Sequence, residues 1–270
     1  MAVRPVFRRY ALAIQYHGSS FLGVTKQKHE DTLLQDTTDL RGYRSVQSRL
    51  EEALEAVPMT TWENLQFSSR TDRGVHALKN TAHVDIADNS TDVSHRLLRS
   101  LNQQLRLQKP WFVRNGNIAP IDWKKGRFYS RRGCQEWSRS VNELEVLNVL
   151  PAPQSMPNPQ EGTEIDWHAR FSATERTYCY RVLYSSHETT PAPAPAFEWD
   201  RSWHVVDSRR TMYVEAMQEG ASYLVGEQDF SSFRGSGCQR STPVAHLFDA
   251  KVHVQPYSFF GSDIMPSCAD

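Results

Sequence analysis

Residues 68–77 read SSRTDRGVHA and lie between two short runs typical of β-strands, residues 65–67 and 81–86. A loop between two strands is where a rigid sheet can present a reactive side chain. This loop carries a single carboxylate, Asp72, and a glycine, Gly74, that lets the backbone turn sharply or approach another group closely. The stretch therefore predicts a strand, a loop and a second strand, with one candidate reactive group in the loop.

Asp72 by itself permits two interpretations. Arg70 and Arg73 flank it, and nearby guanidinium groups favour an ionised carboxylate, which suits a nucleophile better than a general acid. An aspartate between strands is more often a turn residue, whose side chain accepts hydrogen bonds from nearby backbone N–H groups. On the aspartate alone, the turn role is favoured.

Outside this loop, helices and strands alternate without a strict β-α-β rhythm, which indicates an α+β fold. Apolar runs predict strands, and apolar residues at helical spacing predict helices. The expected strands cover residues 9–16, 145–149, 177–184 and 244–254. The expected helices cover residues 46–54, residues 94–106, and a segment that starts after Asp207 or Ser208 and ends at Gly226.

Charge is balanced over the whole chain but not along it. The chain has 31 basic and 31 acidic residues, yet residues 96–139 hold eleven lysines or arginines against two acids. A basic stripe on a neutral protein is the electrostatic pattern that phosphate binding needs. A solvated basic segment is the alternative, and for residues 114–140 it is at least as well supported.

Composition argues against several other classes of protein. The four cysteines are scattered, which indicates a reducing compartment and neither a disulfide framework nor a zinc site. His76, His83 and Asp85 are not completed by a compact set of metal ligands, so packing or hydrogen bonding is the favoured role for them. We also expect neither a signal segment nor a membrane span, since no apolar run is long enough.

The ten residues of the loop resemble the active-site motif of the TruA family of tRNA pseudouridine synthases, G/S-R-T-D-x-G-V-H-A, and nine of the ten positions fit it. Other stretches resemble further family segments, in the family's order. They are residues 16–23 (YHGSSFLG), 45–54 (SVQSRLEEAL), 101–105 (LNQQL), 168–180 (HARFSATERTYCY) and 229–234 (DFSSFR). The likeness is greatest to the metazoan branch called tRNA pseudouridine synthase-like 1, whose motif also begins with two serines.

The resemblance implies an α+β fold with two ferredoxin-like halves that share an antiparallel sheet. Residues 8–150 would form an N-terminal catalytic half that carries the Asp72 loop, residues 151–164 a linker, and residues 165–258 an incomplete C-terminal half. Two departures from the family pattern accompany it. Residues 110–143 look like an insertion, either a basic and aromatic nucleotide-stacking surface or an unevolved segment. The C-terminal part looks truncated, because no arginine follows Arg240 to pair with the catalytic carboxylate.

The resemblance also implies the reaction, which isomerises uridine to pseudouridine in tRNA with neither metal nor organic cofactor. Asp72 would be the nucleophile. Tyr178 would pack on the uracil and accept a proton, although plain strand packing beside Tyr180 is its alternative role. Arg70 would aid extraction of the target nucleotide. The other substrate-binding residues would be Arg73, His76, Arg170 and Arg176.

Partners and location are also expectations at this point. The partner would be tRNA, with a possible homodimer and no membrane. Arg4, Arg8 and Arg9 suggest mitochondrial import, with a cytoplasmic or nuclear location as the alternative. A catalytically inactive or unstable isoform, acting at most as an RNA-binding module, is the alternative function. A metal-dependent nuclease or phosphotransferase is disfavoured, because it needs clustered carboxylates and the loop offers one.

Overall fold

A computed structural model describes twelve stretches of the chain and divides it into two compact units, Met1–Cys179 and Tyr180–Asp270. The described residues are 5–26, 44–87, 92–107, 112–114, 117–119, 143–157, 164–185, 198, 201–206, 212–235, 238 and 241–255.

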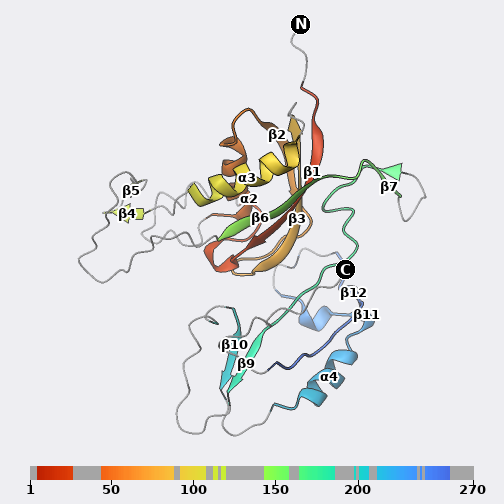
Figure 1. Cartoon of the computed structure of the whole chain (residues 1–270). Coiled ribbons are helices and arrows are strands. Elements are labelled where there is room, and N and C mark those ends of the chain that lie inside the picture. The colour runs from red at the N-terminus through yellow and green to blue at the C-terminus, as the bar shows by residue number, and fades with distance from the viewer. Residues whose placement is uncertain are drawn as a thin grey trace. The chain divides into compact units, whose positions relative to one another are not determined.

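The first unit is built on a four-stranded antiparallel sheet with the strand order β2-β3-β1-β6 (Figure 1). Its elements in chain order are β1 (Arg8–Tyr16), α2 (Val46–Glu55), β2 (Thr61–Phe67), β3 (Ala77–Ala87), α3 (Val93–Leu107) and β6 (Leu144–Pro151). This β-α-β-β-α-β order with these neighbours is the ferredoxin-like arrangement. The first unit therefore agrees with the predicted α+β class and its antiparallel sheet.

One face of this sheet and both helices enclose the core. Alternate residues of β1 are buried, and the register pairs Leu12 with Ala82 and Tyr10 with Val84, so these side chains share a face. Leu50 of α2 and the leucines of α3 pack into the same cluster. Ser45 caps α2 because its hydroxyl accepts a hydrogen bond from the backbone N–H of Ser48. The binary pattern of the sequence is thus sufficient to build this layer.

The face of the sheet that lies opposite the helices carries polar side chains. Arg9, Ala11 and Ala13 alternate with the core residues of β1 and oppose Asp85, His83 and Thr81 of β3. Both His83 and Asp85 are buried. The prediction that these two residues share a face of one strand is therefore confirmed, and their role is taken up below.

Short strand pairs lie outside the main sheet. β4 (Phe112–Arg114) pairs with β5 (Asn117–Ala119), and β7 (Met156–Pro157) pairs with β8 (Glu164–Ile165). Part of the predicted 151–164 linker is therefore a strand pair. Apart from β4, β5 and Glu143, the predicted insertion at 110–143 lies outside the described residues, as does the proline-rich stretch at 191–196.

The described residues of the second unit form two separate strand pairs and one α-helix. β9 (Val182–Ser185) runs parallel to β10 (Trp203–Val206), and β11 (Gly226–Asp229) is antiparallel to β12 (Val244–Leu247). The helix is α4 (Val214–Ser222), and none of its residues is buried. A short 3₁₀ turn, η4 (Ser231–Phe233), follows β11. A second ferredoxin-like half stays a prediction.

The predicted elements are confirmed where an apolar face meets a core. The helices expected at 46–54 and 94–106 and the strands expected at 9–16 and 145–149 all form. The strand expected at 177–184 is wrong over residues 177–181, which are irregular. Tyr178 and Tyr180 are 64% and 89% exposed, so their alternation marks no buried face. The final helix begins at Val214, and the caps expected at Asp207 and Ser208 lie outside the described residues.

Asn102 of α3 attaches the helix to the edge strand β6. Its side-chain amide donates to the carbonyl oxygen of Val146 at 2.8 Å and accepts from the Val146 N–H at 2.9 Å. We expect Asn102→Ala to lower the free energy of unfolding by about 1–3 kcal/mol, because two partly buried backbone groups lose their partner. Gln103→Ala, at an exposed position of the same helix, is the control and should change it by less than about 0.5 kcal/mol. Denaturant unfolding of both variants measures the difference, and equal values would contradict this role.

Candidate active site

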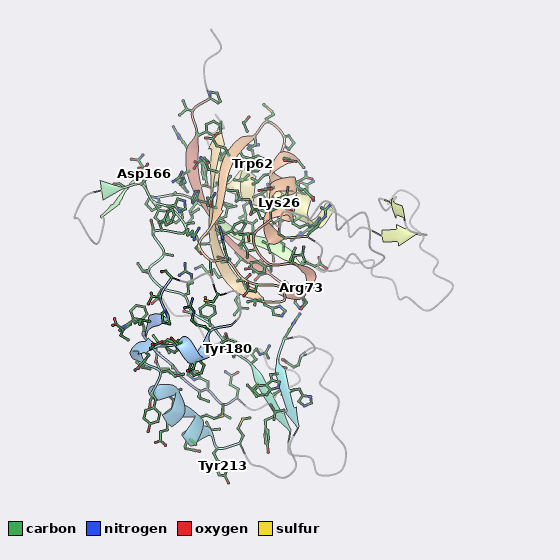
Figure 2. The ribbon with its side chains drawn as sticks, turned by 180° about the vertical axis from the view of Figure 1, so that it is seen from behind. Lys26, Trp62, Arg73, Asp166, Tyr180 and Tyr213 are labelled. Carbon is green, nitrogen blue, oxygen red and sulfur yellow. The ribbon has the colours of Figure 1, made fainter. Side chains whose placement is uncertain are left out.

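The Asp72 loop joins the end of β2 to the start of β3, at the end of the sheet opposite Trp62 (Figure 2). Ser68 N–H still donates to the Thr81 carbonyl at 2.7 Å, so the ladder continues into the loop. A turn then closes where Val75 N–H donates to the Asp72 carbonyl at 3.2 Å. Gly74 has a φ of +82° in this turn, a conformation that favours glycine.

The backbone of the loop lies directly against the segment that follows β1. Val24 N–H donates to the Thr71 carbonyl at 3.1 Å. A Cβ atom on Gly18 would stand 2.1 Å from the Val75 carbonyl oxygen, and one on Gly23 would stand 2.8 Å from that of Thr71. Both distances are far shorter than a carbon and an oxygen tolerate. These two glycines are therefore what allows the two segments to approach each other.

Side chains tie the same two segments together. A hydrogen bond of 2.9 Å joins the Tyr16 hydroxyl to the hydroxyl of Thr71. The amide of Asn80 donates to the Tyr16 oxygen and to the Ser69 carbonyl, both at 3.2 Å, and accepts from the Ser68 hydroxyl at 2.9 Å. Burial raises the pKa of Tyr16, although its hydrogen bonds to Thr71 and Asn80 oppose the shift. Tyr16 is thus a neutral structural link to the loop.

His76 takes part in this bracing. Its Nδ1 accepts a hydrogen bond from the Gly18 N–H at 3.2 Å, and its ring packs edge-on against His17 with the ring centres 4.5 Å apart. The imidazole is therefore engaged on the protein side through Nδ1. The predicted contact of His76 with substrate stays a prediction, and the contacts seen here position the loop.

Asp72 itself projects from this braced backbone. Its side chain is exposed, and among the described residues nothing forms a hydrogen bond or an ion pair with its carboxylate. Arg70 and Arg73 are exposed as well and, within the same set, form no ion pair with it. If Asp72 were a turn residue, its side-chain carboxylate would accept hydrogen bonds from nearby backbone N–H groups. In this structure the backbone carbonyl of Asp72, and not its carboxylate, closes the turn. The carboxylate is consequently available for another partner.

Residues 167–176 lie on the polar face of the sheet and end at the loop. Arg9 donates to the Trp167 carbonyl at 2.9 Å, and His83 Nδ1 accepts from the Ala169 N–H at 3.1 Å. Further along, Arg176 donates to the Ser68 carbonyl at 2.8 Å. The structure thus brings Arg176, one of the predicted substrate-binding residues, to the base of the Asp72 loop.

Two other predicted residues of this segment face solvent. The Arg170 guanidinium stacks over the ring of Phe171, with its carbon 5.7 Å from the ring centre, and the side chain is exposed. Tyr178 is 64% exposed. Within the described residues its side chain makes no hydrogen bond, so the alternative of strand packing is not supported.

Sequence reasoning missed the residues that hold the loop. Gly18, Gly23 and Asn80 lie inside or beside the segments that were noted, and nothing in their spacing says that they meet. The pairing of Arg9 with Asp85 was also missed. The sequence did contain a signal for this pairing. Asp85 is a charged residue among apolar residues of a predicted strand, and a buried charge needs a partner.

Only a small part of the predicted basic stripe lies in the described residues. Arg96, Arg99 and Arg106 lie on α3, while most of the stripe up to residue 139 lies outside the described residues. Arg96 donates to the Pro58 carbonyl and to the Thr60 hydroxyl, both at 3.1 Å, and so also serves the fold. Within the described residues there is no group of three or more His, Cys, Asp or Glu side chains that could hold a metal ion. The helices described here are also too short or too polar to cross a lipid bilayer.

Comparison with known proteins identifies the family. No protein-family profile matches the chain. The chain is 30% identical over 248 residues to tRNA pseudouridine synthase A of Dinoroseobacter shibae, an alignment that covers 92% of this chain and 69% of the relative. The chain belongs to the tRNA pseudouridine synthase A, or TruA, family. It is also 32% identical to the protein of that name from Paraburkholderia phytofirmans and 29% identical to that from Ehrlichia canis, over 92% and 90% of this chain.

The match covers nearly all of the chain but less of the relatives. The chain spans 66% of the length of the Paraburkholderia phytofirmans protein and 71% of that from Ehrlichia canis. Because the Paraburkholderia phytofirmans alignment covers 248 of the 270 residues, at most 22 of them lie outside it, and it includes the Asp72 loop. The closer likeness to the metazoan branch stays a prediction.

The approach of Gly18 to the loop gives a direct test of the bracing. We expect Gly18→Ala to lower the free energy of unfolding by about 1–3 kcal/mol, because its Cβ would overlap the Val75 carbonyl and push the segments apart. Gly220→Ala in α4 is the matched control, since its Cβ would meet nothing within 4 Å. That control should be neutral or stabilising by up to about 1 kcal/mol. Thermal unfolding that ranks the two variants in the opposite order would refute the contact.

His83 gives the fold a pH dependence. Burial and the nearby positive charge of Arg9 lower the pKa of His83 from 6.5 to about 4. Between pH 4 and pH 6.5 the unfolded chain binds more protons than the folded one. The contribution of His83 to the free energy of unfolding is therefore complete above pH 6.5 and declines as the pH falls towards 4. His83→Gln should flatten the loss of stability across that window. His95→Gln, at an exposed position, should leave it unchanged, and unfolding curves from pH 4 to 7.5 compare the two.

Proposed function

We propose that this chain converts uridine to pseudouridine in tRNA and that Asp72 is the nucleophile. The curated relatives are named tRNA pseudouridine synthase A, and the chain belongs to their family. The observation that carries the proposal is the carboxylate of Asp72, which is exposed and without a partner among the described residues, on a loop whose backbone is fixed at both ends.

The chemistry matches what this loop offers. The reaction breaks the bond between ribose C1′ and uracil N1, turns the base, and joins C1′ to C5, while the C5 proton leaves and N1 gains one. Nothing is oxidised and nothing is hydrolysed. A carboxylate can attack ribose C1′ and be displaced as C5 bonds to that carbon, or it can attack the base and leave again once the new bond has formed. Asp72 can supply that group because no hydrogen bond from the described residues occupies its carboxylate.

The substrate must present its target base outside the helical stack. Arg70 and Arg73 are exposed on either side of Asp72, and a planar guanidinium can take the place of an extracted base. Arg170 and Arg176 are exposed residues of the segment that reaches the loop, and we assign them to binding the flipped nucleotide and its phosphates. Tyr178 follows this segment and is also exposed, and we assign it to packing on the uracil and accepting a proton. A polyanionic substrate suits this set of cations.

Several finer parts of the hypothesis are proposals of the same kind. They include a second ferredoxin-like half within residues 165–258, a homodimer, and a mitochondrial rather than cytoplasmic or nuclear location. Sedimentation of the purified chain would test the dimer, and microscopy of the tagged chain would test the location.

Asp72→Asn is the decisive substitution, because it keeps the shape of the side chain and removes the charge. We expect Asp72→Asn to lower pseudouridine formation on an unmodified tRNA transcript by at least about 10⁴-fold, since the nucleophile is lost. Binding of the transcript should stay within about threefold, because phosphate contacts come from arginine and lysine. Mapping of pseudouridine and a filter-binding assay measure the two quantities.

Asp92→Asn is the control for this experiment. Asp92 is an exposed carboxylate beside α3 whose oxygen accepts the His95 N–H, and asparagine can accept it too. This variant should keep full activity. Pseudouridine formation at a near wild-type rate by Asp72→Asn would sink the nucleophile assignment. Binding of tRNA without any activity in the unaltered chain would favour a non-catalytic RNA-binding role.

A further inference from the structure

The polar face of the sheet carries a partly buried ion pair for which the proposed chemistry has no use. Arg9 Nε and Nη2 donate to the two carboxylate oxygens of Asp85 at 2.7 and 2.9 Å, a two-pronged contact between directly opposed residues of β1 and β3. Asn64 adds a third hydrogen bond to Asp85 at 2.9 Å. The remaining terminal nitrogen of Arg9 donates to the Trp167 carbonyl.

Stability alone is a weak reason for such a pair. Asp85 is 7% exposed, and replacing a buried ion pair by apolar residues is often neutral or stabilising. Burial would raise the pKa of Asp85, but hydrogen bonds from Arg9 and Asn64 outweigh it and the net pKa is lowered. The pair is therefore ionised and fixed in direction. Arg9, held in place by Asp85, binds the backbone carbonyl of Trp167 in another segment.

That segment is tethered along β3 at successive positions. Trp167 is held by Arg9 at the level of Asp85. Ala169 is held by His83, which lies two residues closer than Asp85 to the start of β3 and so to the Asp72 loop. A tight turn from His168 to Ser172 stiffens the segment, because each residue donates its backbone N–H to the other, at 3.0 and 2.8 Å. The tethers thus advance along the strand towards the Asp72 loop.

The last tether lies at the loop itself. Arg176 donates to the carbonyl of Ser68, whose N–H is bonded to Thr81, two residues beyond His83 on the same face of β3. Ser68 is also four residues before Asp72. The three tethers, at Asp85, His83 and Ser68, therefore form one series that starts at the ion pair and ends at the base of the loop.

We propose that Arg9 and Asp85 are positioning residues for the reaction, which hold residues 167–176 on the sheet so that Arg176 fixes Ser68 and, through it, the loop of Asp72. The proposal rests on the proposed function for its kinetic consequence. Its structural consequence does not depend on that function: the order of the Asp72 loop should depend on the contacts of Arg9 with Asp85 and Trp167, at the far end of the segment.

A double-mutant cycle tests the coupling. Arg9→Met keeps the aliphatic stem and removes the fork, and Arg176→Met removes the last tether. We expect each to lower kcat for pseudouridine formation by about 10- to 100-fold, and the double variant to be no slower than the slower single one. KM should change by less than about threefold in Arg9→Met, whereas it should rise in Arg176→Met, because Arg176 is also assigned to the substrate. Arg9→Lys should recover little, because an ammonium group cannot make the two-pronged contact and reach Trp167 together.

Gln15→Met is the control, since Gln15 lies on the same face of β1 and donates to Glu145 at 2.9 Å without touching residues 167–176. It should leave kcat unchanged. Hydrogen exchange of residues 68–76 in the free chain supplies a readout that needs no activity. Exchange there should speed up at least about fivefold in Arg9→Met and Arg176→Met and stay unchanged in Gln15→Met.

The outcomes separate this inference from the proposed function. If the unaltered chain has no activity, the exchange measurement decides alone: faster exchange in both arginine variants upholds the positioning role, and unchanged exchange overturns it. If the chain is active, fully multiplicative losses of kcat, or an Arg9→Met variant with a lower Tm and a normal kcat, overturn it and leave a structural ion pair.

Discussion

The close approach of two backbone segments is the constraint on which the candidate site depends. The chain after β1 and the loop before β3 are distant in sequence, yet their peptide groups come so near at Gly18 and Gly23 that a single methyl group would not fit. Once the segments meet, Thr71 can accept the Val24 N–H and share a hydrogen bond with Tyr16. The sheet supplies the rigidity, and this contact transmits it to the loop.

A second constraint comes from polar groups on the face of the sheet without helices. His83 and Asp85 would be costly to bury alone, so each has a partner that reaches across from another segment. The partner of His83 belongs to the stretch that the family motif HARFSA begins, whereas the partner of Asp85 is Arg9, which also donates to Trp167 just before that motif. The motif thus has a physical basis in this chain: its first residues form a tight turn, and its backbone satisfies the buried side chain of His83. The exposed arginines that follow remain available to a substrate.

Much of the first unit could be predicted from the sequence, because its signals are local. The alternation in β1 and the stripes of α2 and α3 need no knowledge of distant residues, and all three elements form as expected. The loop position of Asp72 follows from its two flanking strands in the same way. The contacts that brace the loop depend on pairs such as Arg9 and Asp85, 76 residues apart, whose meeting is decided by strand order. The tyrosines at 178 and 180 misled for a related reason, since alternation predicts a strand only where a core exists to receive one side of it.

The described braces on the Asp72 loop come from residues between Arg9 and Arg176, all within the first compact unit. The position of Asp72, the proposed nucleophile, is therefore defined by contacts within one unit. Substitutions in the second unit leave these described contacts in place. In evolutionary terms, the loop and the second unit can diversify at different rates within one chain.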